Sequence, residues 1–150
     1  VPCGFERWRV DPKTRKVSRS AIDTSPQEFP RVDERRFGQS YRHAWIVSQP
    51  NETVSNFVAA NALYHHDLET GEKRSYSFGP DLVGGEFVFV PRTPDAEEAD
   101  GWLIGLVIDA KNDTTQLQFF EALDIEQGPI GAIHIPHRIP PGFHGNWIPD

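Results

Sequence analysis

Short apolar stretches of strand length, separated by turn-forming residues, recur along the chain. Residues 7–10 alternate charged and apolar side chains, which is the pattern of a half-buried strand. No window of 12 residues has an apolar period of 3.6 residues that is free of Gly and Pro. The predicted strands are residues 7–10, 16–22, 41–47, 57–66, 73–78, 85–90, 101–109, 116–121, 130–135 and 143–148. Eight to ten short strands with regular turns are typical of a sandwich, a barrel or a propeller.

An internal repeat favours the propeller among these architectures. The Asp-x-x-Thr pattern at residues 11–14 recurs at residues 67–70, in both places between two predicted strands. The Glu-Phe pair at residues 28–29 recurs at residues 86–87. In both cases the number of residues between the first copy and the second falls within the roughly 40–60 residues of a propeller blade made of four short strands. The matching residues are few, so the sandwich and the barrel stay open on this pattern alone.

Composition and charge narrow the classes of function. The 150 residues carry 15 Lys and Arg against 22 Asp and Glu, a net charge of −7, so nucleic acid is not an expected partner. The longest apolar run, residues 102–108, is too short to span a bilayer. The single cysteine, Cys3, cannot form an internal disulfide, which predicts a cytoplasmic location. Because the sequence contains no Met, we expect it to be part of a longer or processed protein.

Glu86 is a carboxylate within an apolar strand. Phe87 and Phe89 share one face of the predicted strand 85–90, and Glu86 shares the other face with two valines. A carboxylate is rarely buried in such a strand unless it is paired, hydrogen-bonded or near a metal. Two interpretations stay open: a buried Glu86 with a partner, or a Glu86 that reaches water from the end of the strand.

Six histidines are the other candidates for metal chemistry. His65 and His66 are adjacent, so in a strand they point to opposite faces, and we expect at least one to face solvent. His134, His137 and His144 lie close in sequence, but no cysteine or second ligand pair at zinc-finger spacing accompanies them, so separate structural histidines are the alternative. His144 is the strongest candidate because it follows Pro-Pro-Gly-Phe, a stiff turn that fixes the position of a side chain.

Four stretches of the chain together resemble the carotenoid cleavage oxygenase family, which includes apocarotenoid and lignostilbene dioxygenases. They are residues 28–35 (EFPRVDER), 85–92 (GEFVFVPR), 97–102 (EEADGW) and 136–145 (PHRIPPGFHG), in the family's order and spacing. The resemblance implies an all-β fold, namely the C-terminal blades of a seven-bladed β-propeller. Residues 1–150 would then be part of one domain without an internal boundary. The chain has Ala-Asp before Gly-Trp where the family commonly has Asp-Asp, in a loop where we expect no catalytic effect.

The resemblance also implies an Fe(II) centre held by four histidines from different blades. His144 would be the last of these ligands, and the other three would lie outside this chain. Glu86 would accept a hydrogen bond from the ring nitrogen of His144 that does not bind iron, and Glu28 would do the same for a histidine outside the chain. Such a carboxylate fixes the tautomer of the ligand and raises its basicity. Three aromatic side chains are expected to wall the substrate cavity: Phe29, Phe87 and Phe143.

The activity that the resemblance implies is oxidative cleavage of a conjugated C=C bond in a carotenoid, apocarotenoid or stilbene. The partners would be an apolar polyene or stilbene and O₂, with a peripheral membrane contact through regions outside this chain. Two alternatives stay open: a non-catalytic propeller remnant that acts as a binding module, and an isomerase or hydrolase on the same iron scaffold. The segment alone is expected to be inactive, because one histidine cannot retain Fe(II) in a catalytic geometry.

Overall fold

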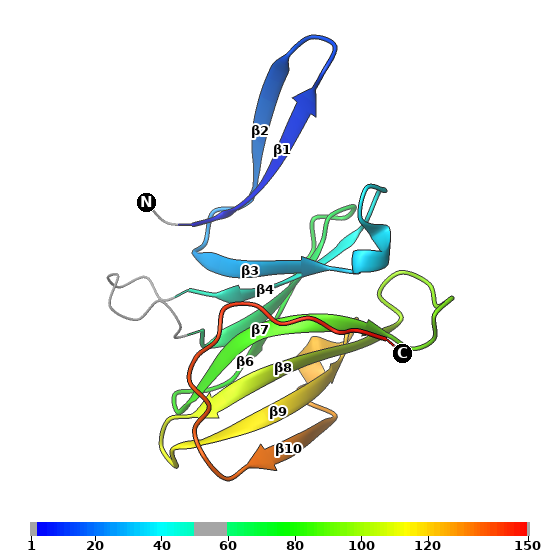
Figure 1. Ribbon diagram of the computed structural model, residues 1–150. Helices are drawn as coiled ribbons and strands as arrows, with labels where there is room; N and C mark the ends of the chain where they lie inside the picture. The colour runs from blue at the N-terminus through cyan, green and yellow to red at the C-terminus, as the bar shows by residue number, and fades with distance from the viewer. Residues whose placement is uncertain (1–2, 50–59, 150) are drawn as a thin grey trace.

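The structure, a computed structural model, describes residues 3–49 and 60–149, whose strands form a hairpin and two four-stranded sheets (Figure 1). The hairpin pairs β1 (Phe5–Asp11) with β2 (Lys16–Asp23). The first sheet consists of β3 (Gln27–Val32), β4 (His43–Ser48), β5 (Ala62–Asp67) and β6 (Lys73–Ser77). The second sheet consists of β7 (Leu82–Pro91), β8 (Gly101–Asp109), β9 (Thr114–Glu121) and β10 (Gly131–Ile135).

Each sheet is an antiparallel meander in which strands that follow one another in sequence pair side by side. The first strands of the two sheets, β3 and β7, pack against each other. Two short 3-10 helices, η1 (Glu34–Arg36) and η3 (Ile125–Gln127), complete the described regular structure. No helix among the described residues is long and apolar enough to cross a membrane. The chain therefore folds as two blade-like sheets with a hairpin attached.

Most predicted strands are present, and two differences are informative. Residues 143–148 do not form a strand: they follow the Pro-Pro-Gly of residues 140–142, and side chains bind their backbone groups. The pattern does not predict β3, because Pro30 and charged residues interrupt its apolar positions. The predicted strand 57–66 corresponds to β5, and residues 57–59 of that prediction lie outside the described part of the chain.

The first predicted strand forms, but the expectation that it is half-buried is wrong. Trp8 is 61% exposed and Val10 is 66% exposed, and the hairpin extends away from the two sheets (Figure 1). The guanidinium of Arg19 lies over the Trp8 ring, 4.6 Å from its centroid, and bonds to Glu6 at 2.7 Å. The alternating charged and apolar side chains of β1 therefore make cross-strand contacts within the hairpin and do not form a buried face.

The repeated aspartate closes the same turn in several hairpins. Asp11 accepts hydrogen bonds from the backbone N–H groups two and three positions later, and Asp67 does the same. Asp109 makes a third such turn between β8 and β9, which the sequence pattern misses because Asn112 replaces the threonine. The fourth position after each aspartate has a positive φ, between 54° and 78°. The side chain therefore supplies the hydrogen bonds that hold each tight turn.

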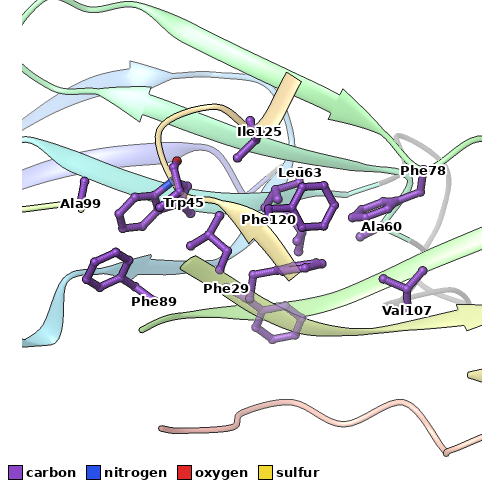
Figure 2. Close-up of a cluster of buried hydrophobic side chains, with 14 residues drawn as sticks. Phe29, Trp45, Ala60, Leu63, Phe78, Phe89, Ala99, Val107, Phe120 and Ile125 are labelled. Atoms are coloured by element: carbon purple, nitrogen blue, oxygen red, sulfur yellow. The ribbon is translucent and has the colours of Figure 1, made fainter. Parts of the chain in front are cut away.

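The hydrophobic core lies between the two sheets and is rich in aromatic side chains (Figure 2). Trp45 stacks on Phe89 with ring centroids 5.2 Å apart, and its indole N–H donates to the backbone of Ala122 at 2.8 Å. Phe87 packs edge-on against Phe120 with centroids 5.5 Å apart. The predicted two-faced character of β7 is confirmed, since its phenylalanines face this core and the opposite face is left for Glu86 and the valines.

His65 and His66 point to opposite faces of β5, but both are buried, so the expectation that one faces solvent is wrong. Nε2 of His65 lies 3.0 Å from Nδ1 of His43, and the His65 ring stacks on Trp45. His66 Nε2 lies 2.8 Å from Oε1 of Gln27, and the base of the hairpin packs on its ring. The face of β5 opposite the core is thus covered at His66 by Gln27 and by Phe5 at the base of the hairpin.

A tight contact at Gly105 gives a direct test of the core. A Cβ at this position would lie 2.6 Å from the Phe87 ring, whereas a Cβ at Gly131 in β10 would meet nothing within 4 Å. We expect Gly105→Ala to lower the free energy of unfolding by about 1–3 kcal/mol through overpacking. Gly131→Ala is the matched control and should change it by less than about 0.5 kcal/mol. Denaturant unfolding measures both; equal effects would contradict the packing described.

The buried histidines predict a loss of stability at mildly acidic pH. Burial lowers the pKa of His65 to about 4 and also lowers the pKa values of His43 and His66. Between the unfolded-state pKa of about 6.5 and the lower folded-state pKa, the unfolded chain binds more protons than the folded chain. The free energy of unfolding therefore decreases as the pH decreases through this range. For His65 the slope approaches about 1.4 kcal/mol per pH unit. Denaturant unfolding from about pH 7 to pH 5 should show this decline, and His65→Gln should reduce it.

Candidate functional site

Residues 136–149, here called the strap, cross the face of the second sheet that lies opposite the core (Figure 1). The N–H of Ile139 donates to Oγ1 of Thr115 at 2.8 Å, which fixes the start of the crossing. Farther along, a cavity of about 240 Å³ lies between the strap and β7, β8 and β9. Its apolar lining comes from Val88, Val90, Ile104, Leu106, Leu117, Phe143 and Trp147. His144 and Glu86 also border this cavity.

Glu86 attaches the strap to β7. A β-bulge between Gly84 and Phe87 interrupts the pairing with β8, which leaves Glu86 outside the regular ladder. The Glu86 side chain is only 5% exposed. Its Oε2 accepts the N–H of Gly145 at 2.8 Å, and its Oε1 lies 3.1 Å from Nδ1 of His144. Of the two interpretations that the sequence leaves open, the structure shows the buried carboxylate with partners.

The contact with Glu86 determines how His144 can act. An ionised carboxylate only accepts hydrogen bonds, so this contact favours a proton on Nδ1 of His144, and in a neutral ring with that tautomer the lone pair is on Nε2. The His144 side chain is 71% exposed, and Phe29 packs edge-on against it with ring centroids 5.6 Å apart. A neutral imidazole in this tautomer is a ligand that suits iron and related metals. The described residues hold no group of three or more His, Cys, Asp and Glu that could bind an ion.

The other predicted site residues divide between the site and the rest of the fold. Phe143 lines the cavity beside His144. Phe29 belongs to the buried core and does not line this cavity, but its ring packs against Phe143 with centroids 6.4 Å apart. Phe87, by contrast, is 2% exposed on the core face of β7 and does not line this cavity, because successive strand residues point to opposite faces. Glu28 acts instead on Cys3, because its carboxylate raises the pKa of that thiol. Its predicted role toward another histidine stays a prediction.

Sequence reasoning missed Arg31, which reaches the strap from β3. Its guanidinium donates to the carbonyl oxygen of Gly145 at 3.0 Å and lies 3.5 Å from Glu86. The only signal for it was its place in the stretch 28–35. His134 and His137 are exposed, as expected for histidines without a shared site.

Comparisons with known proteins agree with this architecture. The sequence model of the family described as retinal pigment epithelial membrane protein matches residues 1–149. The lignostilbene-alpha,beta-dioxygenase isozyme III of Sphingomonas paucimobilis is 39% identical over 95% of this chain and 31% of its own length. A carotenoid cleavage oxygenase of Mycobacterium tuberculosis is 37% identical over 97% of this chain and 29% of its own length. The chain thus spans about three tenths of the length of these relatives.

A solved structure supports the same relationship. The cobalt-substituted apocarotenoid oxygenase of Synechocystis superposes with a TM-score of 0.88 at 31% identity, covering 98% of this chain and 30% of that one. The two sheets therefore correspond to part of a propeller, as the internal repeat and the resemblance predict. A family match over nearly the whole chain and an identity above 30% to several members lead to one conclusion. The chain belongs to the family of retinal pigment epithelial membrane protein and the carotenoid cleavage oxygenases.

Proposed function

We propose that this chain is the C-terminal segment of a non-haem Fe(II) dioxygenase that cleaves a conjugated C=C bond of a carotenoid, apocarotenoid or stilbene. The observation that carries the proposal is the pair of His144 and Glu86, in which a buried carboxylate holds the imidazole by Nδ1 and leaves Nε2 available. The names of the relatives, which are carotenoid and lignostilbene oxygenases, supply the reaction class.

The residues of this chain fit an iron centre to which the chain would contribute one ligand. His144 would bind the ion through Nε2, and the remaining ligands would come from outside this chain. When bound, iron supplies the redox chemistry that lets O₂ react with a closed-shell double bond. Glu86 keeps the proton on Nδ1, sets the orientation of the ring and places a negative charge near a cation held by neutral imidazoles. A relative that accepts cobalt is consistent with a site of this kind.

The reaction needs little from the protein besides the metal and an apolar cavity. One O₂ and one C=C bond give two carbonyl groups, with one oxygen atom in each product, so no further oxidant or reductant is consumed. The cavity beside His144 is lined mainly by aliphatic and aromatic side chains, which suit a polyene or stilbene and exclude water. This chain would form one wall of the substrate site, with Phe143 next to the ligand.

The alternative of a non-catalytic binding module is less well supported. A buried carboxylate is costly unless its partners compensate it, and an apolar side chain on β7 would pack the strap at lower cost. The pairing of a buried Glu86 with a histidine is therefore better explained by a metal site than by stability. Cleavage with ¹⁸O₂ tests the reaction class: a dioxygenase places labelled oxygen in both products, and an isomerase or hydrolase places it in neither.

Substitutions of the pair test the site in the full-length protein that contains this chain. His144→Ala should abolish stoichiometric Fe(II) and turnover. Glu86→Gln removes the charge, leaves an amide of similar shape and should weaken metal binding by about 10–100-fold. His134→Ala, at an exposed histidine, is the control and should keep wild-type metal content. Full iron content in His144→Ala, measured by elemental analysis, would refute the role of this residue.

The chain by itself should hold little iron. Its described residues offer a single candidate ligand, and one imidazole does not retain Fe(II) against water. We expect residues 1–150 expressed alone to copurify with well below one iron per chain and to show no cleavage activity. Elemental analysis and product assays check this, and one tightly bound iron per chain would show that the ligand set is complete within these residues.

A further inference from the structure

Arg31 links the first sheet to the strap. It lies in β3 directly after a β-bulge in which Phe29 and Pro30 face the single residue Ile46 of β4. Pro30 has no N–H to donate, which a bulge tolerates, and Phe29 adopts a φ of 57°. The bulge keeps the Phe29 ring buried, while the Arg31 side chain, 16% exposed, extends to the strap.

Groups from three segments surround the guanidinium. Nη2 donates to the carbonyl oxygen of Gly145 at 3.0 Å and to Oδ1 of Asn146 at 3.4 Å. The same nitrogen lies 2.8 Å from Oε1 of Glu34, and Nη1 lies 3.5 Å from Oε1 of Glu86. Nε is buried without a hydrogen-bond partner among the described residues. The strap and the two carboxylates therefore set the orientation of the guanidinium, although this leaves one donor unsatisfied.

Gly145, the residue after His144, is hydrogen-bonded through both its N–H and its carbonyl oxygen. Oε2 of Glu86 accepts the N–H of Gly145 at 2.8 Å, and Arg31 donates to the carbonyl oxygen of Gly145 at 3.0 Å. Glycine has no side chain to restrict its backbone, so these two hydrogen bonds limit the freedom that it would otherwise have. The main chain next to the imidazole is thereby fixed to β7 and β3 together.

Arg31 also balances the charge of Glu86. The carboxylate is 5% exposed, and a buried charge without an opposite charge is costly. Nη1 of Arg31 stands at 3.5 Å from Oε1, farther than Nδ1 of His144 at 3.1 Å. The guanidinium thus supplies positive charge without displacing the hydrogen bond to the imidazole.

We propose that Arg31 is a positioning residue of the candidate metal centre, which orients His144 by holding Gly145 and Glu86. This inference rests on the proposed function, since a metal ion is what makes a fixed position of His144 useful. Arg31 acts through Gly145 and Glu86, and a loss of Arg31 therefore loosens the ligand instead of removing it.

The test uses Arg31→Ala and Arg31→Lys in the full-length protein, with Co(II) as the probe because a relative accepts it. Arg31→Ala should weaken Co(II) binding by about 10-fold and change the visible absorption of bound Co(II). In the metal-free protein, hydrogen exchange of the peptide 143–148 should become faster. Arg31→Lys keeps the charge but not the planar fork, so it should recover part of the affinity.

Arg74→Ala is the matched control. Arg74 also bonds to a carboxylate, Glu72 at 2.9 Å, and to a distant backbone carbonyl, that of Leu123 at 2.9 Å, but it does not contact the strap. This variant should keep wild-type Co(II) affinity and wild-type exchange of residues 143–148. If thermal unfolding shows that Arg31→Ala is not folded, Arg31→Lys decides the test, with weaker Co(II) binding and faster exchange as the expected result.

Two results would overturn the inference. Arg31 variants that match Arg74→Ala in both measurements would show that Arg31 does not position the site. Faster exchange with unchanged Co(II) affinity and absorption would show that Arg31 holds the strap and has no effect on the ligand. A separate result, unchanged Co(II) binding in His144→Ala, would refute the proposed function itself, so the two failures are distinguishable.

Discussion

The buried carboxylate of Glu86 is the group on which the arrangement of the site depends. It is 5% exposed, on a strand whose opposite face builds the aromatic core, and it binds both the ring of His144 and the backbone of Gly145. A buried acceptor without such partners would be costly, so the strap and the carboxylate stabilise each other. The position of His144 is therefore set by a strand residue 58 positions earlier rather than by local structure.

A β-bulge in the first strand of each sheet explains how polar residues reach the strap from core-forming strands. In β7 the bulge contains Glu86, while in β3 it follows Glu28 and contains Phe29 and Pro30. The two Glu-Phe pairs are thus not at equivalent positions of their bulges. Glu28 stays within the regular ladder opposite Val47, and its carboxylate acts on the Cys3 thiol rather than on the strap.

Sequence reasoning succeeds where the cause is local and fails where burial depends on distant segments. The Asp-x-x-Thr turns were predictable because the aspartate bonds to its own neighbours in the chain. The hairpin's alternating residues looked half-buried, and one of His65 and His66 looked solvent-exposed, because a pattern shows which residues share a face but not what covers it. The same limit applies to Phe87, whose face turned out to be the core.

The amino-acid sequence alone gives most of the strands, two of the Asp turns, the family and the candidate pair of His144 and Glu86, since these rest on local periodicity and on motifs. Only the tertiary structure decided that Glu86 is buried with its histidine and that Arg31 holds the strap. The physical reason is that burial and ion pairing depend on contacts across the fold. Arg31 and Gly145 are 114 positions apart, and no local pattern reports that they meet.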